Sequence, residues 1–197
     1  MSQAIKQYMA DEGVDNLRES SLSINSDDLN DDELATNNDK FFQKYLKAQI
    51  CEEGCFADRY KTQTGEMSFA VGKSADLHLG IKGRYLLPDG MVVDTYFEPV
   101  IGSDTRPGEL YVDVNGRKGP NKIGYDLWSM SVFYDGTIDE GTLTPECRKD
   151  SNKCSNGYGN TPKEIRDYRF EMCRTDSNGS YGGCFGHFME NGFKFDY

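Results

Sequence analysis

Basic residues are scarce in this chain of 197 residues, which has 22 Lys and Arg against 33 Asp and Glu. The formal net charge of −11 argues against a nucleic-acid partner, because binding a phosphate backbone requires patches of Lys and Arg. Anionic membrane surfaces are disfavoured for the same reason. Long apolar runs are also lacking: no segment approaches the roughly eighteen apolar residues of a membrane span, and residues 1–6 contain no apolar core of an export signal.

The signatures of several enzyme classes are missing as well. The sequence has no Gly-x-Ser-x-Gly elbow, no phosphate-binding glycine loop and no His-Glu-x-x-His motif. Cys184 and His187 are close enough in sequence to act as a nucleophile and its base. The even number of cysteines favours a disulfide for Cys184 instead. We therefore expect a protein that is not an enzyme.

An even set of six cysteines is present, in three pairs that are close in sequence. A zinc knuckle would need Cys-x-x-Cys, which does not occur, and the two histidines are not spaced to complete one. Disulfides are favoured over reduced thiols, and they place the protein outside the cytosol. Six cysteines permit many connectivities. Pairing of sequence neighbours would join Cys51 with Cys55, Cys147 with Cys154, and Cys173 with Cys184.

The N-terminal part of the chain predicts two helices. Apolar residues at helical spacing over residues 2–12 stop at Gly13, and this short helix has no clear N-terminal cap. A second apolar face follows Asp39, which is a good N-cap residue. The predicted order is the end of a longer helix at residues 1–17, an exposed acidic loop at 18–38 and a second helix at 39–51.

The rest of the chain, residues 67–197, predicts a sheet with loops. Residues 76–97 form a hairpin around Pro88-Asp89-Gly90, and a second hairpin turns at Asp135-Gly136. Thr161 and Pro162 begin a helix that runs to Met172. Together these elements make one α+β domain over residues 1–197. Further strands are expected at 67–71, 109–114, 127–134 and 136–138, with a loop at 143–160 and a final hairpin within 185–197.

Residues 112–126 (VDVNGRKGPNKIGYD) resemble a stretch of type IV pilin-like proteins and type II secretion pseudopilins. In that stretch an Asp-x-Asn-Gly turn is followed by Gly-Pro-Asn and by Gly-x-Asp before an aromatic strand. Residues 41–47 (FFQKYLK) and 184–197 (CFGHFMENGFKFDY) are similar to the same group. The resemblance implies a pilin-like fold, in which an N-terminal helix packs on an antiparallel sheet.

The resemblance also implies features that precede a pilin head. Family members have a leader cleaved by a prepilin peptidase, a methylated N-terminus and an apolar helix half that anchors the subunit in the membrane before assembly. This sequence matches the soluble head alone, beginning partway along the helix. The expected partners are other pilin or pseudopilin subunits. The expected location is the bacterial cell envelope, at the inner membrane or periplasm, or an extracellular filament.

The loop at 112–126 has two interpretations. One is a rigid turn, in which Asx side chains cap backbone amides and Gly116 supplies a positive φ. The other is a calcium site made of hard oxygen donors, a feature known for major pseudopilins. No cofactor is otherwise required. The candidate calcium ligands are Asp113, Asn115, Asn121 and Asp126.

Two functions are consistent with these patterns. The first is a structural subunit that polymerises through its N-terminal helix and exposes its head. The second is a secreted or surface adhesin, in which loops closed by the C-terminal cysteines present Tyr158 and Tyr181 to a partner. Those loops are rich in Gly, Ser, Asn and Tyr, a composition that suits adaptable recognition.

Overall fold

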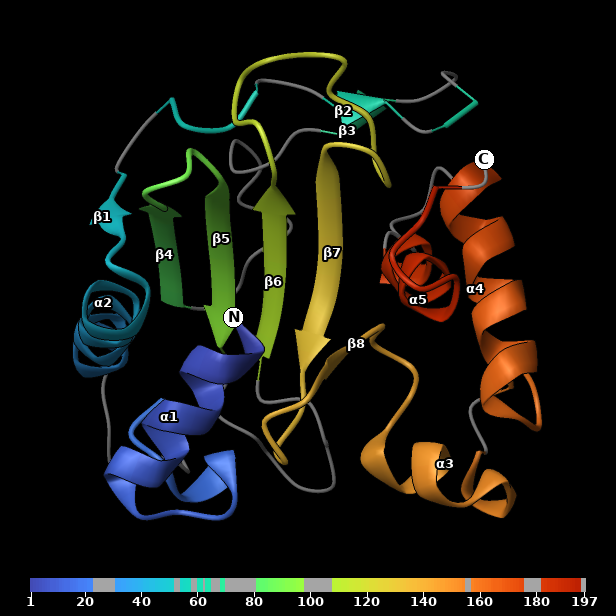
Figure 1. The fold of residues 1–197 in the computed structure, drawn as a ribbon, viewed down its shortest axis with the longest axis horizontal. Helices are drawn as coiled ribbons and strands as arrows, with labels where there is room; N and C mark the ends of the chain where they lie inside the picture. Colours follow the sequence, from blue (N-terminus) through green and yellow to red (C-terminus); the bar gives the residue numbers. More distant parts are fainter. Residues whose placement is uncertain are drawn as a thin grey trace.

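The computed structural model of the protein shows an α+β fold, in which helices lie on and beside one antiparallel sheet (Figure 1). It describes residues 1–22, 31–51, 54–57, 60–61, 63–64, 68–69, 81–97, 108–154, 157–175 and 182–195.

The sheet has six antiparallel strands in the order β1-β4-β5-β6-β7-β8. A separate two-stranded ribbon pairs β2 with β3. Apart from that ribbon, each strand lies beside the next strand of the sheet along the chain, so the sheet is a meander. The strands are β1 (Gln49–Ile50), β2 (Tyr60–Lys61), β3 (Ser68–Phe69), β4 (Ile81–Leu86), β5 (Val92–Phe97), β6 (Gly108–Asp113), β7 (Leu127–Val132) and β8 (Ile138–Asp139).

Both predicted hairpin turns are confirmed. The β4–β5 turn closes with a hydrogen bond from the Gly90 amide to the Leu87 carbonyl at 3.0 Å. The β7–β8 turn closes with one from the Gly136 amide to the Phe133 carbonyl at 2.9 Å. In both turns the glycine has a positive φ, 92° at Gly90 and 74° at Gly136, as in a hairpin loop that ends in a left-handed residue. Strand register is therefore set locally at these two places.

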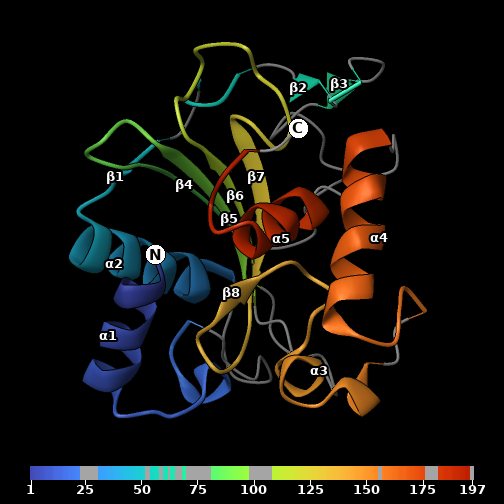
Figure 2. The same cartoon turned by 45° about the vertical axis from the view of Figure 1, so that its right-hand side comes forward.

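Helices cover one face of the sheet at its two ends. Register places Tyr85, Val93, Val112 and Trp128 on that face. Helix α2 (Asp31–Leu46) covers β4, where the ring of Phe42 stacks on that of Tyr85 with centroids 3.9 Å apart. Helix α5 (Gly182–Glu190) covers β7 on the same face, toward the opposite edge of the sheet (Figure 2). Its Phe188 ring lies 4.7 Å from that of Trp128.

The helix predicted over residues 2–12 is confirmed as α1 (Ser2–Glu12), which ends at Gly13 with φ of 70°. The wider range of 1–17 is wrong, because residues 14–16 are not helical. Its Tyr8 ring packs edge-on against Phe41 of α2, at 5.4 Å between centroids. The chain after α1 forms the 3-10 helix η1 (Leu17–Glu19) and bonds to the β7–β8 turn through the Leu17 amide. Helix α1 therefore packs on α2 and on one end of the sheet, while α2 covers the strands.

The predicted start of the second helix is wrong, because α2 begins at Asp31 rather than at residue 39. It also ends at Leu46, before β1 begins at Gln49. Two asparagines in its second turn lie against the rest of the protein. Asn38 is buried, and the Asn37 side chain donates to the Ser21 carbonyl at 3.0 Å. No apolar periodicity marks such contacts. Residues 23–30 of the predicted acidic loop lie outside the described residues.

The predicted loop at 143–160 contains two short helices. Helix α3 (Pro145–Lys149) begins with the side chain of Thr144 accepting from the Cys147 amide at 3.2 Å. The 3-10 helix η2 (Ser151–Lys153) begins in the same way at Asp150. Both starts use an N-cap residue, and α3 has Pro at its first position. Such capping signals extend over only a few residues and come without an apolar stripe, so the sequence pattern indicated a loop.

The predicted final hairpin is also wrong, because residues 182–190 form α5. The Asn191-Gly192 step ends this helix: the Phe193 amide donates to the Phe188 carbonyl at 2.8 Å, and the two rings meet at 5.5 Å. Gly183 is the position that permits close packing on α4 (Pro162–Thr175), since a Cβ there would lie 1.9 Å from the Arg169 carbonyl oxygen. The predicted helix at 162–172 is confirmed as part of α4.

Candidate functional site

The loop between β6 and β7 is fixed at its base by backbone hydrogen bonds. The Val114 amide donates to the Asp126 carbonyl at 2.9 Å, next to the last pair of the β6–β7 ladder. The middle of the loop reaches the β2–β3 ribbon: the Lys61 amide donates to the Asn121 carbonyl, and the Ile123 amide donates to the Lys61 carbonyl, both at 2.9 Å. The loop is therefore held from two sides.

Asp113, at the end of β6, is fully buried under this loop. Its Oδ1 accepts from the Asn115 amide at 3.0 Å, which is the expected Asx turn. Its Oδ2 accepts from the hydroxyl of Tyr60, which in turn accepts from the Ala57 amide at 3.1 Å. Burial raises the pKa of the Asp113 carboxyl, and burial together with the adjacent carboxylate raises the pKa of Tyr60.

Asp126 and Asn115 complete the network. Asp126 Oδ2 accepts from the Lys122 amide at 3.2 Å. The terminal amide of Asn115 lies 3.4 Å from Asp126 Oδ1 and, in its better-satisfied orientation, donates to Asp113 Oδ1 at 3.1 Å. Asn121 has φ of 55°, and no donor in the described part of the chain reaches its buried Oδ1. Three of the four predicted ligands are thus brought together, and Asn121 is not hydrogen-bonded to them.

This arrangement fits the rigid-turn interpretation better than the calcium interpretation. Calcium takes about six to eight oxygen ligands, whereas both oxygens of Asp113 and Oδ2 of Asp126 already accept protein hydrogens. Across the described ranges, no group of three or more His, Cys, Asp or Glu side chains is arranged to hold a metal ion. We therefore expect a rigid turn at this loop, and measuring its response to calcium is the test.

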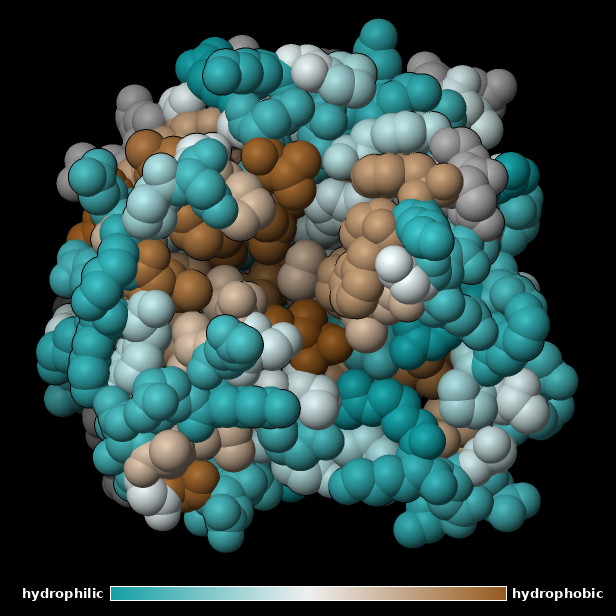
Figure 3. All heavy atoms as spheres, in the orientation of Figure 1, coloured by the Kyte–Doolittle hydropathy of each residue, from teal (hydrophilic) through white to brown (hydrophobic). Residues whose placement is uncertain are grey.

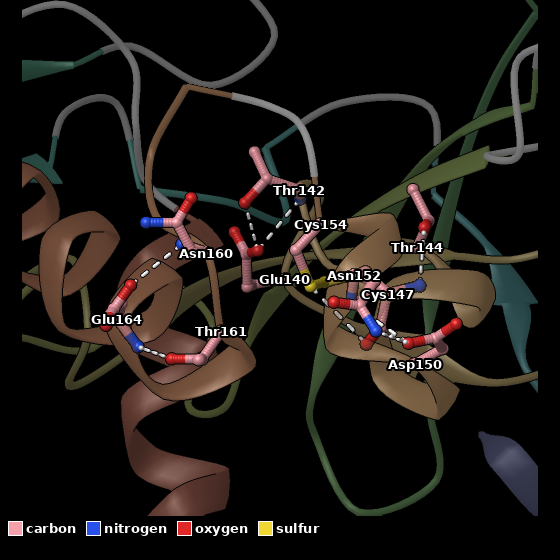
Figure 4. The surroundings of a disulfide bond; sticks show 10 residues. All are labelled: Glu140, Thr142, Thr144, Cys147, Asp150, Asn152, Cys154, Asn160, Thr161 and Glu164. Atoms are coloured by element: carbon pink, nitrogen blue, oxygen red, sulfur yellow. Dashed lines mark hydrogen bonds between the residues drawn. A yellow bond between two sulfur atoms is a disulfide. The ribbon is translucent and has the colours of Figure 1, made fainter.

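All six cysteines form the disulfides expected between sequence neighbours. Cys173–Cys184 joins α4 to α5. Cys147–Cys154 joins α3 to the residue that follows η2, within a set of capped turns (Figure 4). The sulfur of Cys184 is therefore bonded, and the His187 ring stacks on Phe170 at 3.7 Å.

Comparisons with protein-family models, curated proteins and solved structures find no match for this chain. No helix among the described residues is both long and apolar enough to cross a membrane.

Tyr158, one of the two predicted binding residues, is half-buried against Tyr168 of α4, with ring centroids 5.5 Å apart. The guanidinium of Arg169 lies over the Tyr158 ring at 5.3 Å. Tyr168 itself is 50% exposed, so the pair presents one ring to solvent. Tyr181 lies outside the described residues.

A buried ionic network is a feature that the sequence patterns did not reveal. Asp139 at the end of β8 pairs with Arg166 of α4 at 2.8 Å and with Arg148 of α3 at 3.4 Å. Glu140 is fully buried and pairs with Arg169 at 3.3 Å. Burial raises the pKa of the Glu140 carboxyl. One sequence signal could have indicated the network: the i, i+3 spacing of Arg166 and Arg169 places both side chains on one face of the helix.

Proposed function

We propose that this protein is a non-enzymatic structural subunit of a bacterial type IV pilus or type II secretion pseudopilus. The observation that carries the proposal is the placement of the N-terminal helices α1 and α2 against one antiparallel sheet. This is the architecture that the resemblance of residues 112–126 implies. In the proposed role the N-terminal helix mediates assembly and the sheet with its C-terminal helices forms the exposed head.

The face of the sheet that carries the helices supports the role of an assembling subunit. The N-terminus lies on the side of the sheet that carries the helices (Figure 1), and an apolar hollow surrounded by hydrophilic residues opens on the same face (Figure 3). The strands turn Val93, Val112 and Trp128 toward this face. An apolar hollow of this kind is a surface that packing of a neighbouring subunit would use.

The disulfides support an extracytoplasmic location. Three of them occur in one chain of 197 residues, and such bonds persist in oxidising compartments. The bacterial periplasm and the cell surface are compartments of that kind. We therefore propose that the protein acts in the cell envelope or in an extracellular filament, with other pilin or pseudopilin subunits as its partners.

The test is to locate the epitope-tagged native gene product in its host by immunoelectron microscopy and by shearing of the cell surface. The proposal expects label along filaments, or in short envelope-bound assemblies that cross-link into ladders of subunit multiples. A tagged protein that stays monomeric after cross-linking in every fraction would refute it. A tagged, unrelated disulfide-bonded periplasmic protein serves as the control.

A second candidate function, an adhesin, is favoured by the Tyr158–Tyr168 ring pair. A solvent-exposed aromatic ring backed by a second ring is a rigid contact surface. Replacing Tyr168 by Ser removes the exposed ring, and replacing it by Phe keeps the ring as a matched control. An adhesin using this pair would lose surface binding with Tyr168→Ser and keep it with Tyr168→Phe, while filament formation would be unchanged in both variants.

A further inference from the structure

The three disulfides differ in their access to solvent. The four cysteines of Cys147–Cys154 and Cys173–Cys184 are between 0% and 8% exposed. Cys51 and Cys55 are half-buried, so they are the accessible pair. Exchange of a disulfide requires a thiolate to reach one of its sulfur atoms, and the rate therefore depends on access. The chain thus holds two buried bonds and one that is partly exposed.

The accessible bond joins two segments that are each held in place by other contacts. On one side the Cys51 amide donates to the Arg84 carbonyl at 2.8 Å and extends the pairing of β1 with β4. On the other side Phe56 and Ala57 are buried in the core, and the Gly54 carbonyl accepts from Arg117 at 3.3 Å. Opening this bond leaves these anchors in place, so the two thiols stay near each other and can re-form the bond.

The protected bonds have a different role. Cys173–Cys184 holds α5 against α4, and α5 covers Trp128 of the sheet. Cys147 and Cys154 belong to a separate small core cluster with Leu143 and Ile165. Reaching these sulfurs requires the helices that cover them to move apart. Their reduction is therefore coupled to loss of packing, whereas reduction of the accessible bond is local.

We propose that Cys51–Cys55 is a reversible thiol–disulfide exchange site whose reaction partner is a dithiol. One thiolate of the dithiol attacks a sulfur of the bond, forms a mixed disulfide and expels the other cysteine as a thiolate. The second thiolate of the dithiol then attacks the dithiol's own sulfur in the mixed disulfide, closes a disulfide within the dithiol and expels the second cysteine as a thiolate. The dithiol is oxidised by two electrons, and the cysteine pair takes up these electrons and two protons. The site is independent of the filament role.

The test is graded reduction of the native protein with dithiothreitol, trapping of free thiols with N-ethylmaleimide and peptide mapping by mass spectrometry. We expect Cys51 and Cys55 to be labelled at least about tenfold faster than the other four cysteines. Circular dichroism should stay native during this phase, and oxidised glutathione should reverse it. Labelling of all six cysteines in one step that coincides with unfolding would overturn the proposal, as would faster labelling of either buried pair.

Two double variants sharpen the result. Cys51→Ser with Cys55→Ser should remove the fast labelling phase and leave the slow phase unchanged. Cys147→Ser with Cys154→Ser should keep the fast phase at its original rate, and loss of the fast phase in this control would contradict the assignment. If a variant fails to fold, the order of labelling in the unmodified protein still decides the question.

Discussion

Removing the hydroxyl of Tyr60 should destabilise the fold, because it deprives two buried groups of a hydrogen-bond partner. Tyr60 and Asp113 are both fully buried, and the hydroxyl donates to the Asp113 carboxylate while accepting from the Ala57 amide. A buried hydrogen bond to a charged group contributes about 2 kcal/mol and a neutral one about 1 kcal/mol. We therefore expect Tyr60→Phe to lower the free energy of unfolding by about 3 kcal/mol.

The matched control is Tyr45→Phe, which removes a hydroxyl that bonds to Asp11 at the surface, at 2.7 Å. Water can replace that bond, so we expect little change in stability. The assay is guanidinium unfolding followed by circular dichroism and by the fluorescence of Trp128, the single tryptophan. Equal unfolding free energies for the two variants would refute the argument that Asp113 depends on Tyr60.

Three further outcomes are expected. Phe42→Ala should lower the free energy of unfolding by about 4 kcal/mol, because the Phe42 ring is fully buried against Tyr85. Phe193→Ala is the control and should change that free energy little, because Phe193 is 63% exposed. Denaturant unfolding measures both variants. Burial raises the pKa of Glu140 above its ordinary 4.5, so its contribution to stability should fall as pH rises through and above that value. Unfolding measured across that pH range should show the fall, and Glu140→Gln should lack it. Calcium should leave the melting temperature unchanged, because the carboxylates of the β6–β7 loop already accept protein hydrogens; a calcium-dependent rise in scanning calorimetry would restore the metal interpretation.

The elements that the sequence predicts well are those with a strong local signal. Helix α1 combines an apolar stripe with a glycine stop, and both hairpins have Asp-Gly turns between apolar strands. The three disulfides follow from nearest-neighbour pairing, since short loops bring these cysteines together. In each case the determining contacts are within a few residues along the chain.

The elements that the sequence predicts poorly depend on contacts between distant segments. The segment 185–189 is apolar enough for a strand, and only its packing on α4 and on Trp128 selects the helix. Near the start of α2, the Asn37 side chain donates to the Ser21 carbonyl, a contact with a segment sixteen residues earlier. The loop between β6 and β7 shows the same difference between local and distant contacts. Its Asx turn at Asp113 was predictable, but the hydrogen bond of Asp113 to Tyr60, fifty-three residues earlier, was not.

The meander order of the sheet has a consequence for how the chain folds. From β4 to β8 each strand pairs with the one before it, so most sheet contacts join segments close in sequence. Closing short loops costs little entropy, and folding rates rise as average contact separation falls. We expect the sheet to assemble stepwise as the chain emerges from its synthesis or export machinery. Helix α5 can cover Trp128 only at the end, so burial of that side chain reports the last step of folding.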